Sequence, residues 1–206
     1  MQLTFDTSIR LLSKLVVIAT LLLIFAGALI KSHEVGLSVP DWPTSYGKQM
    51  FSFPLSEMVG GIFYEHGHRV FATIVGFLTL VLAVLIGFSN QPQWVKKTSL
   101  LALILVVCQG LLGGMTVLYF LPPPISILHG ILAQTFFALT IFISYSQSKI
   151  RTKKQQLSSV LYMRRGAVIL ASLVYFQLIL GALMRHTGSG LAIPDFPTMG
   201  GLWFPS

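Results

Sequence analysis

Apolar residues occur in five long runs along the chain, separated by short polar stretches. The runs cover about residues 11–30, 68–89, 98–120, 125–146 and 166–184. A helix needs roughly 20 mostly apolar residues to cross the hydrocarbon core of a membrane, and each run comes near this length. The pattern therefore predicts an all-α membrane protein with five spanning helices.

The connections between the runs are short. Residues 121–124 read Leu-Pro-Pro-Pro and separate the third run from the fourth. Prolines stop a helix sharply, so this connection predicts a tight hairpin. Because short connections require antiparallel neighbours, we expect the first four runs to form a four-helix transmembrane bundle, with the fifth helix beyond it.

Composition agrees with a membrane protein. The 206 residues are 54% hydrophobic and only 10% charged, with a mean hydropathy of +0.78. Soluble domains carry about a quarter charged residues, so lipid is the expected surrounding. The net charge of +8 comes from short basic clusters between apolar runs, which is the pattern of cytoplasmic loops and argues against a nucleic-acid partner.

The distribution of Lys and Arg predicts the orientation. If the N-terminus is cytoplasmic, the inner side holds ten basic residues: Arg10, Lys14, Lys96, Lys97, Lys149, Arg151, Lys153, Lys154, Arg164 and Arg165. The outer side then holds four: Lys31, Lys48, Arg69 and Arg185. Cytoplasmic loops carry the excess of positive charge, so residues 31–67 and 185–206 are expected outside.

The two outer loops repeat each other. Residues 27–47 align with residues 181–201 at a constant offset of 154, with ten of 21 positions identical, including a shared Pro-Asp-x-Pro-Thr segment. We interpret this as an internal duplication. It divides the chain into a first four-helix repeat, 1–150, and a second part, 151–206. That part holds a cytoplasmic linker, the fifth helix and the outer loop of an incomplete repeat, so we expect the chain to be truncated.

All five histidines fall on the predicted outer side: His33, His66, His68, His129 and His186. His68 opens the second helix, and His129 lies in the first turns of the fourth. Two histidines at matching depth on alternate helices can face each other across a bundle, where cofactors are commonly held. Imidazole is a standard axial ligand of heme iron, so we predict that His68 and His129 bind one heme. The other three histidines receive no role.

Two charged residues flank His68. Glu65 precedes it by three positions, so both project from one helical face. The carboxylate could accept a proton or stabilise positive charge, or it could simply favour the helix N-terminus. Arg69 could bind a heme propionate, or reach toward the lipid headgroups.

Four motifs together resemble the heme A synthase family. They are the Pro-Asp-Trp-Pro-Thr segment of the first outer loop, YEHGHR at the second helix, QGLLGGMTVL in the third run and PPPISILHG at the fourth. Many bacterial members carry a cysteine pair in the first outer loop. This chain has only Cys108, inside an apolar run, so a thiol role in that loop is not expected.

The resemblance implies a function. Family members have two duplicated four-helix bundles and oxidise the C8 methyl of heme O to a formyl group, with water as the expected oxygen source. By this resemblance Glu65 matches the essential, catalytic acidic residue of the family, and His68 and His129 match the pair that holds heme O as substrate. A second histidine pair, which holds heme b, would begin near position 222, beyond this chain. The truncated chain alone is therefore expected not to complete the redox cycle.

The resemblance also implies a multi-pass protein of the bacterial plasma membrane with its active site outside. Expected partners are heme O, heme A, membrane lipid, a heme O synthase and cytochrome oxidase assembly factors. Two other functions remain open. A non-enzymatic b-type cytochrome subunit would use the same histidine pair but would not need Glu65. A small-solute transporter would need helices broken at mid-membrane, and the spans lack proline.

Overall fold

A computed structural model describes residues 2–148, 160–193, 195 and 197–203 of the protein. The regular secondary structure of these residues is helical, with two isolated β-bridges and no strand. Five helices are long and apolar enough to cross a membrane, which confirms the predicted fold class. They are α1 (Gln2–Ser32), α2 (Gly61–Phe88), α3 (Gln93–Leu118), α4 (Pro123–Ser146) and α5 (Val160–His186).

The chain divides into two compact units, Met1–Lys154 and Gln155–Ser206. The first contains α1 to α4, and the second contains α5 and a short 3₁₀ helix, η4 (Ser189–Leu191). The cytoplasmic linker predicted from residue 151 onward falls largely on residues 149–159, which lie outside the described residues.

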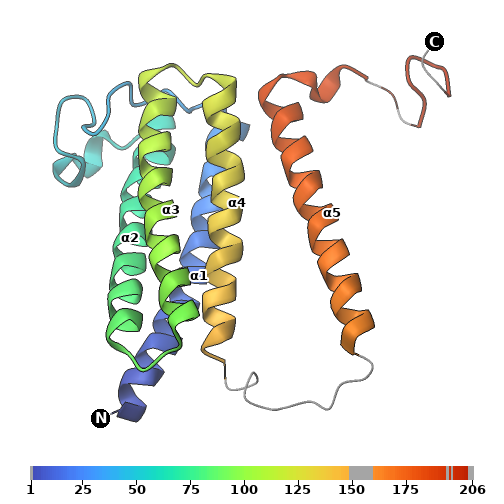
Figure 1. Cartoon of the computed structure of the whole chain (residues 1–206). Helices are drawn as coiled ribbons and strands as arrows, with labels where there is room; N and C mark the ends of the chain where they lie inside the picture. Colours follow the sequence, from blue (N-terminus) through green and yellow to red (C-terminus); the bar gives the residue numbers. More distant parts are fainter. Residues whose placement is uncertain (1, 149–159, 194, 196, 204–206) are drawn as a thin grey trace. The chain divides into compact units, whose positions relative to one another are not determined.

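In the first unit the four helices pack as a ring. The main contacts join α1 with α2, α2 with α3, α3 with α4, and α4 with α1. Helices α2 and α4 therefore lie diagonally across the bundle. The α1–α2 loop, with its 3₁₀ turns η1 (Met50–Ser52) and η2 (Leu55–Glu57), lies at the same end as the α3–α4 connection (Figure 1). We call this the loop end of the bundle.

The connection between α3 and α4 is as tight as the prolines predict. Only four residues separate Leu118 from Pro123. Phe120 and Leu121 have positive φ angles of 56° and 58°, a conformation that reverses the chain within this short length. Pro123 and Pro124 then occupy the first turn of α4, where a missing backbone N–H costs no helical hydrogen bond.

The continuous apolar core fills only the part of the bundle away from the loop end. Its buried residues follow seven-residue spacings on each helix, as in other bundles: Ile9 and Val16, Val75 and Leu82, Val95 and Ala102, and Phe136 and Ile143. No residue of this cluster comes from the first two turns of α2 or α4. Polar groups and glycines occupy the loop end instead.

Several helices begin before the predicted apolar runs; α1, for example, begins at Gln2 and not near residue 11. The boundary that bears on the site is the start of α2. The apolar run placed the start of the second helix near residue 68, whereas α2 begins at Gly61. His68 therefore does not open the helix but lies two turns inside it. The hydropathy pattern missed these turns because they include Glu65, His66 and Arg69, whose polar groups bond to the outer loop.

Candidate functional site

His68 and His129 lie on core-facing rows of diagonal helices. Val75 and Leu82 are buried on α2, and His68 precedes Val75 by one heptad. Phe136 and Ile143 are buried on α4, and His129 precedes Phe136 by the same spacing. Residues seven apart lie on nearly the same face of a helix, so both imidazoles continue the core rows toward the loop end.

The two histidines also lie at matching depth. His68 comes seven residues after the start of α2, and His129 comes six residues after the start of α4. At 1.5 Å per residue, these positions are roughly 9–11 Å along each helix. The structure thus places the pair predicted from sequence at one depth on diagonal helices.

The ring of His68 is available to an absent group. Its Nδ1 atom is buried and has no hydrogen-bond partner among the described residues. A buried imidazole nitrogen normally finds a partner, so this atom fits a site that is completed by a ligand. His129 is half-buried, and its backbone carbonyl accepts a 2.8 Å bond from Gln109 Nε2. This bond links α3 to α4.

Glu65 and Arg69 form a buried ion pair one turn apart on α2. Arg69 Nη2 lies 2.6 Å from Glu65 Oε1, and the two residues are 9% and 4% exposed. The other carboxylate oxygen, Oε2, accepts a 2.9 Å bond from the backbone N–H of Val39. Charged groups at such burial require partners, and these contacts supply them.

Arg69 fastens the outer loop to α2. Its two terminal nitrogens donate to the backbone carbonyls of Val39 (2.7 Å), Asp41 (2.6 Å) and Thr44 (3.2 Å). The planar guanidinium can reach several acceptors at once, which an ammonium group could not do in this geometry. Arg69 is therefore buried under the loop and does not extend toward lipid headgroups. The propionate contact stays a prediction.

The remaining histidines of the first unit also contact their surroundings. His66 Nδ1 lies 2.9 Å from Ser45 Oγ, and the His66 ring packs on the Phe53 ring with the two centroids 4.7 Å apart. His33 stacks on Tyr64 at 5.1 Å. The sequence left both without a role, and the structure uses His66 to anchor the outer loop. His186 ends α5 in the second unit.

Asp41 and Asp195, at matching positions of the repeated segment, accept corresponding hydrogen bonds. Asp41 accepts bonds from Thr44 Oγ1 (2.5 Å), Tyr46 N (2.7 Å) and Gly47 N (2.8 Å). At the offset of 154, Asp195 accepts bonds from Thr198, Gly200 and Gly201. The isolated bridges Ser45–Lys48 and Met199–Leu202 follow the same offset. These matching bonds are what an internal repeat predicts for the two loops.

Hydrogen bonding explains the acidity of both aspartates. Burial of Asp41 raises its pKa, but the bonds from Thr44, Gly47 and Tyr46 more than offset this, so the pKa lies below its ordinary value. The bonds from Thr198, Gly201 and Gly200 lower the pKa of Asp195 to about 2. Both carboxylates are therefore ionised at neutral pH and can hold their turns.

Trp42 is a site neighbour that sequence reasoning missed. Its ring lies so close to Gly114 of α3 that a methyl group there would come within 2.5 Å of it. The ring thus packs on the backbone of α3. Gly113, which precedes Gly114 in the sequence, lies close to the ring of His129. The available signal was the Trp inside the repeated segment together with paired glycines in α3, but neither pattern alone indicates contact between them.

Known proteins resemble this chain along most of its length. Residues 10–206 match a family model described as cytochrome oxidase assembly protein. Proteins named heme A synthase are similar: the one from Shouchella clausii is 28% identical over 91% of this chain and 62% of its own length. The one from Halalkalibacterium halodurans is 25% identical over 96% and 66%. The chain thus spans less than two thirds of these relatives. No solved structure matches it.

Proposed function

The chain belongs to the heme A synthase family of cytochrome oxidase assembly proteins, and from this premise we propose that it acts in heme A biosynthesis. In this proposal heme O is the substrate, and His68 and His129 are the two axial ligands of its iron. The observation that carries the proposal is their placement on the core-facing rows of diagonal helices, at one depth, where the apolar core stops.

The proposed reaction converts the C8 methyl of heme O to a formyl group. The carbon loses four electrons to an acceptor, gains one oxygen from water, and releases four protons in all. Water is the proposed oxygen source because two histidines would fill both axial positions of the iron. The bundle would hold the porphyrin in place and exclude competing solvent.

Glu65 is the proposed catalytic residue. It lies one turn from His68 on α2, so it can reach the edge of a porphyrin whose iron His68 binds. Its contacts with Val39 and Arg69 fix the direction of the carboxylate. The carboxylate would stabilise positive charge that develops at the reacting carbon and accept a proton from the attacking water.

We place the protein in the bacterial plasma membrane, with the N-terminus cytoplasmic and the site near the outer surface. Heme O would come from a heme O synthase, and heme A would pass to cytochrome oxidase assembly factors. A heme b site is proposed for a second histidine pair beyond this chain. Arg69 would contribute to heme binding, through a propionate or through its hold on the loop.

One observation favours a second candidate, an electron-carrying b-type cytochrome subunit. Both oxygens of Glu65 are bonded within the protein, so the carboxylate could serve only to anchor the outer loop. A bis-histidine heme would then be permanent and would carry electrons. The two functions differ in whether the heme leaves the site chemically changed.

The test of the histidine pair is heme binding by the purified chain in detergent. We expect wild-type protein mixed with heme O to give the absorption spectrum of low-spin, six-coordinate iron. His68→Ala and His129→Ala should each lose this spectrum, because one axial ligand is missing. His33→Ala is the matched control, since His33 stacks on Tyr64 at the loop end and should not change the spectrum. An unchanged low-spin spectrum in the double variant would refute the proposal.

A further inference from the structure

Each histidine of the pair packs against a glycine on a neighbouring helix. A Cβ atom added at Gly27 of α1 would lie 3.1 Å from His68 Cε1. A Cβ added at Gly113 of α3 would lie 3.3 Å from His129 Cε1. Both distances are shorter than ordinary van der Waals contact between carbon atoms, so an added methyl would force each ring to move.

Other glycines in the helices do not lie this close to an imidazole ring. A Cβ added at Gly76 of α2, or at Gly110 one turn before Gly113 on α3, would meet nothing within 4 Å. The helix backbone therefore approaches an imidazole at Gly27 and Gly113 but not at these other positions. The two contacts also match the ring of helices, since α1 packs on α2 and α3 packs on α4.

Packing replaces a hydrogen bond as the means of orienting His68. A hydrogen bond from a ring nitrogen to a protein group usually fixes the orientation of a histidine ring. His68 Nδ1 makes no such bond to the described residues. The edge of its ring rests on the backbone at Gly27 instead, which limits rotation of the ring toward α1.

The duplication retains one of these glycines. Gly27 corresponds to Gly181 at the offset of 154, within the segment whose loop bonds recur in both units. A Cβ added at Gly181 would meet nothing within 4 Å among the described residues, so the close contact with an imidazole belongs to Gly27 of the first unit.

We propose that Gly27 and Gly113 are positioning residues of the heme site, setting the ring planes of His68 and His129 through direct backbone contact. The proposal rests on the proposed function, because it takes the two histidines as ligands of one heme. The relative angle of two imidazole planes determines the ligand field of a low-spin iron. Moving either ring therefore changes the electronic spectrum of the bound heme as well as its affinity.

The first experiment uses heme-free protein. Histidine ring carbons and protons are observed by NMR in wild-type, Gly27→Ala, Gly113→Ala and Gly110→Ala chains. We expect Gly27→Ala to shift the Cε1 resonance of His68 and Gly113→Ala to shift that of His129. Gly110→Ala should leave both unchanged. If the two test variants give the same resonances as Gly110→Ala, the contacts do not exist and the proposal is overturned.

The second experiment adds heme O and records electron paramagnetic resonance and affinity. Loss of a contact that orients a metal ligand typically weakens binding by about 10–100-fold, and we expect a loss in this range for each test variant. The g values should shift in Gly27→Ala and Gly113→Ala but not in Gly110→Ala. Unchanged g values and affinity in both test variants would overturn the positioning role.

The two proposals fail in different ways. If wild-type protein gives no low-spin heme, the proposed function fails and the glycines cannot position ligands. If wild-type protein gives low-spin heme but the test variants equal Gly110→Ala, the histidine pair stands and only the glycine proposal fails.

Discussion

At the scale of single residues, the Glu65–Arg69 pair combines two tasks in one place. It is buried, it holds the backbone of the outer loop, and it lies one turn from a proposed heme ligand. Breaking a buried ion pair typically costs about 3–5 kcal/mol because the remaining charge has no partner. A variant at Glu65 must therefore keep a hydrogen-bonding group of the same shape.

Glu65→Gln keeps the shape of the side chain and tests the catalytic role. Its amide oxygen can accept a bond from Arg69 or from Val39 but cannot replace both carboxylate oxygens. The amide also cannot accept a proton or stabilise developing positive charge. We expect heme O binding to persist while heme A formation in cells that depend on this protein falls by about 10²–10⁴-fold, the usual contribution of a general base. Heme extracted from the cells and separated by chromatography gives the measurement.

Glu57→Gln is the matched control, because Glu57 forms an exposed pair with Lys48 on the same loop. It should leave heme A formation unchanged. Normal heme A in Glu65→Gln would exclude the catalytic role, and loss of heme O binding in that variant would assign Glu65 to anchoring the loop.

At the scale of elements, the outer loop is held by two helices of the bundle, α2 and α3. Arg69 holds its backbone from α2, and Trp42 packs on α3 at Gly114. Since Arg69 follows His68 and Gly114 follows Gly113, the loop is linked to the surroundings of both histidines. The loop thus closes the end of the bundle where the apolar core is absent.

Gly114→Ala tests this closure. The added methyl would meet the Trp42 ring at 2.5 Å, so the ring and the loop must move. Overpacking of this kind typically costs about 1–3 kcal/mol, and we expect the free energy of unfolding to fall by this amount. Chemical unfolding in detergent micelles provides the measurement. Gly110→Ala, which has open space around it, should be no less stable than wild type; equal stability of both variants would contradict the packing of Trp42.

Some of these elements could be predicted from the sequence, and others could not. Length and hydropathy were enough for five spans, and the offset of 154 was enough for the repeat. The first two turns of α2 were missed because a hydropathy pattern excludes polar residues such as Glu65 and His66. These residues become helical because the loop supplies their partners. The contacts of Gly27, Gly113 and Trp42 depend on which helices are neighbours, and no local pattern carries that information.

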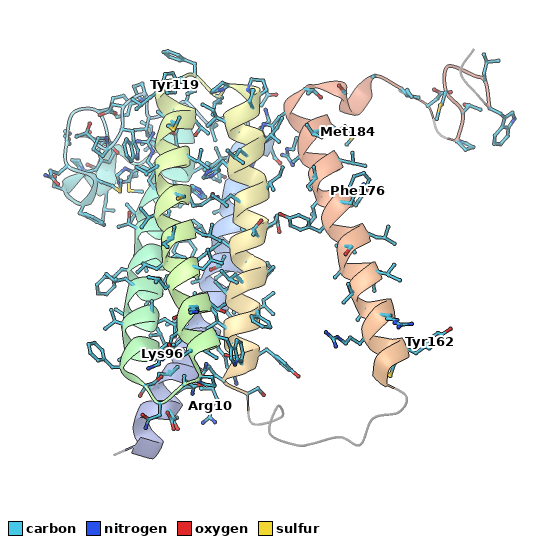
Figure 2. All side chains as sticks on the ribbon, in the orientation of Figure 1. Arg10, Lys96, Tyr119, Tyr162, Phe176 and Met184 are labelled. Carbon is cyan, nitrogen blue, oxygen red and sulfur yellow. The ribbon has the colours of Figure 1, made fainter. Side chains whose placement is uncertain are left out.

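At the scale of the whole molecule, each unit has distinct ends. In the first unit Arg10 and Lys96 lie at one end and Tyr119 at the other, and in the second Tyr162 and Met184 lie at opposite ends (Figure 2). The repeated loop has the same internal bonds in both units, so its conformation is encoded by its own residues. In the first unit, Arg69 also donates hydrogen bonds to backbone carbonyls of that loop.

The orientation of the first unit follows from its charges and can be measured directly. In a chain whose single cysteine is replaced by Cys108→Ser, Lys48→Cys places a thiol on the outer loop and Lys97→Cys places one at the opposite end. Both positions are exposed. Because cytoplasmic loops retain the excess of Lys and Arg, we expect an impermeant maleimide to label the first variant in intact cells. The second should react only after the membrane is permeabilised. The reverse labelling would place the histidine pair on the cytoplasmic side and would remove the basis for an outward-facing site.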